Sequence, residues 1–144
     1  MHITTVDIKT GAVKQRPLTE EEIAALPIPS LSDAKTAKLH RINYAKNTYL
    51  DGGFLHNGVL FDSDSKARLA YLEFAHKLAT SPLYSTPWKA STGVWVTMDA
   101  ALFAALQPAY ESHISACFAW QAAREMEVAA AQSVAEVEAV SEVM

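Results

Sequence analysis

The sequence is poor in cysteine, in basic residues and in long hydrophobic runs, and each shortage excludes a class of protein. Cys117 is the single cysteine among 144 residues, so no disulfide can form within the chain. No run of about 18 apolar residues exists, which argues against a transmembrane helix. Twelve basic residues face 16 acidic ones, and the net charge of −4 leaves no electrostatic footprint for DNA or RNA. We expect a protein that binds neither nucleic acid nor a membrane.

The N-terminus also lacks a targeting signal. No basic segment followed by an apolar stretch comes after Met1, so we expect no signal peptide. A single cysteine fits a reducing compartment, where thiols stay free. With 144 residues, 50% of them hydrophobic, the chain is long enough to bury one core.

Motifs for catalysis or ligand binding are absent as well. There is no G-x-S-x-G nucleophile elbow, phosphate loop or dinucleotide-binding fingerprint. His113 and Cys117 have a helical spacing that metal ligands use, but a zinc site needs more ligands than these two. Asp62 and Asp64 fit a calcium-binding loop, yet Ala67 stands where that loop requires glycine. We therefore predict a non-enzymatic protein with no catalytic residue, cofactor or metal site.

Residues 1–30 are predicted to form an N-terminal arm. Residues 1–16 contain strand-forming side chains, including Ile3 and Val6, and a turn sequence at residues 9–11, which together indicate a β-hairpin. A hairpin alone is marginally stable in water, so this one needs a surface to pack against. Ile3 and Val6 are therefore candidate partner contacts.

A short helix and a stiff segment complete the arm. Thr19 and Glu22 have the spacing of a capping box, in which each side chain binds the backbone N–H of the other residue. Pro27 and Pro29 end this helix after two turns at most. We predict a hinge there, followed by the main domain over residues 31–131.

The main domain is predicted to begin with a helix over residues 33–50, with Ser32 as its N-cap and Gly53 just beyond its end. The apolar stripe of this helix includes Tyr49 but also Lys38. Either the stem of Lys38 lies along apolar neighbours with its amine in water, or this face contacts an acidic partner. Under the second interpretation, Lys38 and Tyr49 are candidate partner contacts.

Two hairpins and another helix follow. Asn57-Gly58 is a strong signal for a hairpin turn, because both residues accept a positive φ. Residues 62–65 are expected to cap an amphipathic helix over residues 64–79, whose acidic first turn suits the helix dipole. A second hairpin is predicted over residues 88–97.

A long helix capped by Thr97 is predicted for the C-terminal third. Its apolar residues recur at steps of three and four, the heptad spacing of helices that pack side by side: Phe103, Leu106, Tyr110, His113, Cys117 and Trp120. Pro108 is expected to kink it. This seam closes either within the chain or between copies; in the second case Tyr110 and Trp120 contact a partner and the chain is a homo-oligomer. Residues 132–144 form an acidic tail, helical or frayed.

Three short motifs precede the long helix in a fixed order. They are Gly-Phe at residues 53–54, Ser-Asp-Ser at residues 63–65 after the Asn-Gly hairpin, and Trp-x-x-x-x-Gly at residues 88–93. This order, between Lys38 and Ala130, resembles a domain of unassigned function found in tail and tail-fibre-associated proteins of bacteriophages and prophages. The resemblance carries over no catalytic residue, and it leaves the acidic tail outside.

The sequence thus predicts an α+β protein of short hairpins, amphipathic helices and a long C-terminal helix, preceded by a hairpin-and-helix arm. The resemblance implies a structural or adaptor component of a phage tail, baseplate or tail fibre that packs against other tail proteins. Two alternatives stay open: a tail-fibre assembly chaperone, and a small hydrolase acting on the host envelope. We expect synthesis in the host bacterial cytoplasm and a place in the virion tail.

Overall fold

The chain divides into two units, which are described separately. The computed structural model describes residues 2–6, 10, 12–24 and 29–144. Met1–Ser30 make up the first unit and Leu31–Met144 the second. Helices and antiparallel hairpins occur in both units, so the predicted α+β fold is confirmed.

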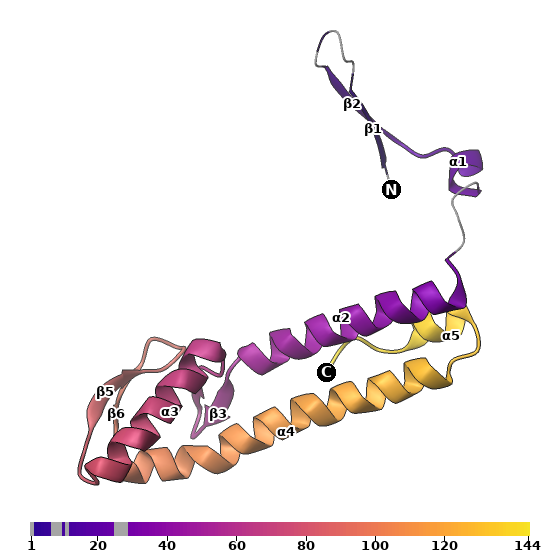
Figure 1. Ribbon diagram of the computed structural model, residues 1–144. Coiled ribbons are helices and arrows are strands. Elements are labelled where there is room, and N and C mark those ends of the chain that lie inside the picture. Colours follow the sequence, from indigo (N-terminus) through magenta and orange to yellow (C-terminus); the bar gives the residue numbers. More distant parts are fainter. Residues whose placement is uncertain (1, 7–9, 11, 25–28) are drawn as a thin grey trace. The chain divides into compact units, whose positions relative to one another are not determined.

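The first unit contains one β-hairpin (Figure 1). β1 (His2–Val6) pairs with β2 (Val13–Pro17) in antiparallel register, and Val6 lies opposite Val13. Both valine side chains are largely exposed, at 59% and 61%. The turn predicted at residues 9–11 falls mostly outside the described residues.

A short helix in the first unit is tied to this hairpin. α1 (Glu20–Ala24) begins with the predicted capping box: the Glu22 N–H donates to Thr19 Oγ1 at 3.2 Å, and the Thr19 N–H donates to the Glu22 carboxylate at 2.9 Å. The Arg16 guanidinium donates to both Glu22 carboxylate oxygens, at 2.6 and 2.5 Å. These Arg16 bonds, aided by Thr19, lower the pKa of Glu22 to about 2. Of the hinge predicted at Pro27 and Pro29, the part up to residue 28 lies outside the described residues.

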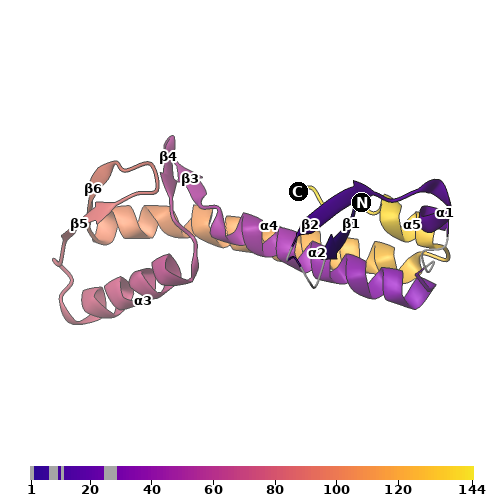
Figure 2. The ribbon, with the colours of Figure 1, turned by 90° about the horizontal axis from the view of Figure 1, so that it is seen from above.

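The second unit is built on two antiparallel helices. α2 (Leu31–Asp51) and α4 (Ala100–Ala130) lie side by side in both views (Figures 1 and 2). The buried side of α2 recurs every fourth residue: Ala34, Lys38, Ile42, Lys46 and Leu50. Two lysines therefore occupy positions that apolar residues usually take.

α2 begins earlier than predicted. Ser32 is not its N-cap but lies inside the helix, where its carbonyl accepts a hydrogen bond from the Thr36 hydroxyl at 3.0 Å. Leu31 packs against a buried cluster that includes Ala34 and Val137. This packing favours extending the helix to include Leu31.

α4 begins later than predicted. Asp99 is its N-cap, and the Asp99 carboxylate accepts the Leu102 N–H at 2.8 Å. Thr97, the predicted cap, is paired with Pro87 in a strand ladder instead. The helix continues through Pro108, where proline removes one backbone hydrogen bond at an exposed position.

Two further hairpins and a helix pack near the start of α4 and the end of α2 (Figure 1). β3 (Phe54–His56) pairs with β4 (Val59–Phe61), and β5 (Thr86–Lys89) pairs with β6 (Trp95–Met98). α3 (Ser65–Thr80) lies between these hairpins in the chain. The hairpins remain separate two-stranded sheets, linked by a hydrogen bond from the Ser91 N–H to the Leu60 carbonyl at 3.0 Å.

The local signals around these elements behave as predicted. Asn57 and Gly58 both have positive φ, at 48° and 78°. Gly53 has φ 90°, just beyond the end of α2. Asp64 caps α3, because its carboxylate accepts the Ala67 N–H at 2.8 Å. The core beneath these turns consists of Phe54, Phe61, Tyr71, Phe74, Ala90, Met98 and Leu106.

The C-terminal segment folds back onto α2. α5 (Val134–Ala139) begins at Ser133, whose hydroxyl accepts the Glu136 N–H at 3.2 Å. Val137 is fully buried, against Ala34 and Ala131. Of the two alternatives for residues 132–144, the helical one is therefore confirmed over residues 134–139, and contacts with α2 and α4 hold this helix in place.

Candidate functional site

The apolar seam of α4 closes within the chain. The Tyr110 ring lies 5.6 Å from that of Phe54 and 5.7 Å from that of Tyr71, and the Trp120 ring lies 6.0 Å from that of Tyr49. Tyr49, Tyr110 and Trp120 are thus partly buried among other parts of the second unit. These ring contacts are internal, but all three side chains remain partly exposed, so their part in partner binding stays a prediction.

Lys38 is buried and paired with the chain's own C-terminal segment. Its Nζ donates to the Glu142 carboxylate at 2.8 Å, to the Val140 carbonyl at 2.8 Å and to the Glu138 carbonyl at 3.0 Å. Only 2% of Lys38 is exposed. The expected contact with an acidic partner is corrected: the acidic group is internal, and the amine does not reach water either.

Arg41 completes what we call the C-terminal clamp, formed by Lys38, Arg41, Glu138 and Glu142. Arg41 donates to the Glu142 carboxylate at 2.7 Å and to the Glu138 carboxylate at 2.6 Å. Hydrogen bonds donated by Lys38 and then Arg41 lower the pKa of Glu142, and those that Arg41 donates to Glu138 and then Glu142 raise the pKa of Arg41. Beyond the clamp, the Met144 N–H donates to the Tyr49 hydroxyl at 2.9 Å.

A serine and a histidine meet at the C-terminal end of α2. The Ser63 hydroxyl donates to the Leu50 carbonyl at 2.5 Å and accepts the Gly53 N–H at 2.9 Å. His113 Nε2 lies 3.1 Å from the same Leu50 carbonyl and 3.3 Å from Ser63 Oγ. Because a carbonyl can only accept, Nε2 carries the hydrogen and cannot take the Ser63 proton. The pair therefore satisfies a helix end, and its geometry is not that of a nucleophile and its base.

The other residues considered for chemistry have structural roles. Burial raises the pKa of the Cys117 thiol, which keeps it protonated at neutral pH. Asp62 accepts a short hydrogen bond from the Ser91 hydroxyl, and Asp64 caps α3. Across the described part of the chain, no group of three or more His, Cys, Asp or Glu side chains could hold a metal ion. Nor is any helix there long and apolar enough to cross a membrane.

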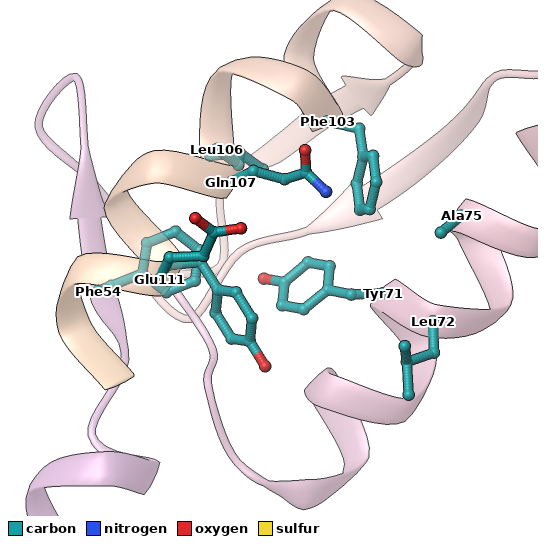
Figure 3. Close-up of a pocket in the computed structure, with 9 residues that line it drawn as sticks. Phe54, Tyr71, Leu72, Ala75, Phe103, Leu106, Gln107 and Glu111 are labelled. Carbon is teal, nitrogen blue, oxygen red and sulfur yellow. The ribbon is translucent and has the colours of Figure 1, made fainter. Parts of the chain in front are cut away.

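An apolar pocket lies between α3 and α4 (Figure 3), with a volume of about 140 Å³. Four aromatic residues line it: Phe54, Tyr71, Phe103 and Tyr110. Leu72 and Ala75 of α3 form one side, while Gln107 and Glu111 project from α4 (Figure 3). The sequence did not predict the pocket, because no periodicity marks a gap between apolar side chains.

Tyr71 forms a rigid, neutral wall of this pocket. Its hydroxyl donates to the Asp62 carbonyl at 3.0 Å, and its ring stacks on that of Trp88 at 5.2 Å. Burial, followed by the nearby charge of Asp62, raises the pKa of Tyr71 far above neutral pH. The phenol therefore stays uncharged.

The remaining candidate contacts lie in the first unit. Ile3 and Val6 belong to β1, where Ile3 is half-buried and Val6 is exposed. An odd number of positions separates them, so they point to opposite faces of the hairpin. The outer edges of β1 and β2 pair with no other strand among the described residues.

The second unit is thus an α+β domain in which an antiparallel helix pair is closed by a C-terminal clamp and bears a small aromatic pocket. Residues 33–142 match the family described as "Domain of unknown function (DUF4376)", and the chain belongs to this family. The match includes Glu138 and Glu142, which the resemblance noted from the sequence left outside. No curated protein and no solved structure matched the chain.

Proposed function

We propose that this protein is a non-enzymatic structural or adaptor component of a bacteriophage tail, baseplate or tail fibre. Its mechanism is packing against other tail proteins. The link to phage tails comes from the sequence resemblance between Lys38 and Ala130. The packing mechanism is supported by the contrast between the two units of the chain.

The observation that carries this proposal is the exposure of the first unit. One two-stranded hairpin and a helix of five residues cannot bury enough apolar area to be stable without further contacts. Val6 and Val13 face each other across the ladder and are both exposed. Two strand edges that pair with nothing in the described part of the chain, together with an apolar face, suit strand addition to a neighbouring protein.

The second unit supports the same proposal, because it covers most of its own apolar residues and needs no partner to fold. Its long apolar seam is covered by its own α2, β3 and α3, so the second unit can stay folded while the arm binds. Its serine–histidine pair is a helix cap, and its pocket presents one carboxylate, Glu111, where glycoside hydrolysis commonly uses a pair. These features favour a binding role over a hydrolase.

Quantitative mass spectrometry of purified tailed particles tests the proposal. The particles come from the bacterium that carries the gene, and the copy number of this chain is compared with those of the other tail proteins. A fixed copy number per particle is expected. A chain that is absent or substoichiometric in particles overturns the structural role; its presence with fibres only before assembly indicates the chaperone alternative.

A pair of variants tests whether the arm makes the contact. Val6→Asp should reduce incorporation into particles, because it places a charge on the exposed hairpin face. Leu83→Asp is the matched control, since Leu83 is fully exposed and lies on the second unit. Equal incorporation of both variants would count against the arm as the contact surface.

A further inference from the structure

The pocket between α3 and α4 has walls suited to a cation. The rings of Phe54, Tyr71 and Tyr110 lie within 5.6 to 6.3 Å of one another, and Phe103 closes a further side. The faces of aromatic rings carry partial negative charge and attract ammonium and guanidinium groups. Burial keeps Tyr71 a neutral phenol.

An acidic group at this pocket is left without a partner. The Glu111 carboxylate makes no hydrogen bond or ion pair with the residues that the structure describes, and neither does the neighbouring Gln107 amide. Three other carboxylates of the second unit are engaged: Glu138 and Glu142 bind Arg41, and Glu127 binds Arg124. A free carboxylate beside four aromatic rings adds charge complementarity for a cation.

The size of the pocket limits what can enter. Its volume of about 140 Å³ is close to that of cavities that hold one benzene ring, at roughly 150 Å³. A nucleotide or a folded backbone segment is too large. The end of one long side chain fits, with its methylenes against the rings and its charge near Glu111.

The surroundings indicate that this side chain comes from a protein. Leu69 and Leu72 lie on α3 and are both more than half exposed, and Leu72 also lines the pocket. An exposed apolar border of this kind suits contact with a macromolecular surface rather than with a free small amine.

We propose that the aromatic pocket binds a lysine or arginine side chain presented by a partner protein, with Glu111 as its counter-charge. This inference rests on the proposed function only in that the partner is a protein. The pocket is then a second contact surface, located on the second unit, and it recognises a cationic side chain.

NMR titration of the full-length protein tests the inference. The probes are acetyl-Gly-Lys-Gly-amide, the same peptide with norleucine in place of lysine, and n-butylammonium. The lysine peptide should shift the amide signals around Phe103 and Glu111 with a dissociation constant on the order of 1 mM, typical of one inserted side chain. The norleucine peptide, which lacks the charge, should bind several-fold more weakly.

Variants separate charge from packing. Glu111→Gln should weaken binding of the lysine peptide about fivefold, as expected for a partly exposed ion pair. Glu125→Gln, at an exposed position further along α4, is the matched control and should have no effect. Phe103→Leu keeps the pocket apolar but removes a ring face, and it should also weaken binding.

Three results would overturn the inference: no binding by the lysine peptide, equal binding of lysine and norleucine peptides, or binding of n-butylammonium without binding of the peptide. The last result would assign the pocket to a free amine. Because this titration needs no phage particle, its failure leaves the mass-spectrometric test of the tail assignment unaffected, and the converse also holds.

Discussion

Deletion of residues 132–144 should strongly destabilise the second unit, although the composition of this segment suggests a dispensable acidic tail. The deletion removes α5 and all three acceptors of the Lys38 ammonium. It also uncovers the cluster formed by Ala34, Ala131 and Val137. The expected change in the free energy of unfolding follows from these two losses.

The magnitude can be worked from burial and charge. Loss of a fully buried valine such as Val137 costs about 1.5–3 kcal/mol. Breaking a buried ion pair costs about 3–5 kcal/mol. For the pair of Lys38 and Glu142 we expect a smaller loss of about 1–3 kcal/mol, because Glu142 is 35% exposed and the deletion lets water reach Lys38. The total loss of about 3–6 kcal/mol is a large part of the free energy of unfolding of a typical protein, which is about 5–15 kcal/mol. It corresponds to a fall in Tm of about 10–20 °C.

Thermal and urea unfolding, followed by circular dichroism, measure this effect. The truncated chain should melt earlier than the full-length protein, and Lys38→Met within the truncated chain should recover part of the loss, because methionine needs no acceptors. Equal Tm and equal cooperativity for the full-length and truncated chains would refute the reasoning.

Three smaller perturbations test the local contacts. Acid should loosen the arm, because the Arg16 contact lowers the pKa of Glu22 from 4.5 to about 2. The stabilisation by this contact is present above pH 4.5 and is lost as the pH falls toward 2, and NMR titration of the Glu22 carboxyl measures the change. Gly53→Ala should cost about 1–3 kcal/mol or more in urea unfolding, because its Cβ would lie 2.7 Å from a β4 carbonyl at φ 90°, whereas Gly58→Ala meets no atom within 4 Å and should cost less. Ser63→Ala should cost about 1–3 kcal/mol in the same assay, because the partly buried Gly53 N–H loses its acceptor.

The features that the sequence predicted correctly are those that depend on near neighbours. The capping box joins Thr19 and Glu22, three positions apart. The turn at Asn57 and Gly58 requires only that each residue accept a positive φ. Such signals are local because the groups that satisfy them lie within one turn of chain, so composition and spacing suffice.

The features that the sequence did not predict depend on where distant segments meet. Lys38 and Glu142 are 104 positions apart, and nothing in either segment indicates that the chain returns to α2. Asp99 displaced Thr97 as the cap of α4 because the β6 ladder extends to Met98 and holds Thr97 in a strand. The aromatic pocket likewise arises from β3, α3 and α4 together.

Hydrogen–deuterium exchange of the free full-length protein tests the central claim most directly. The claim is that the second unit completes its own packing, whereas the N-terminal arm needs a partner. Amides of α2, α4 and α5 should exchange slowly as one cooperative unit, and those of β1 and β2 should exchange orders of magnitude faster. Strand amides as protected as those of the helices, or rapid exchange throughout α5, would contradict this account.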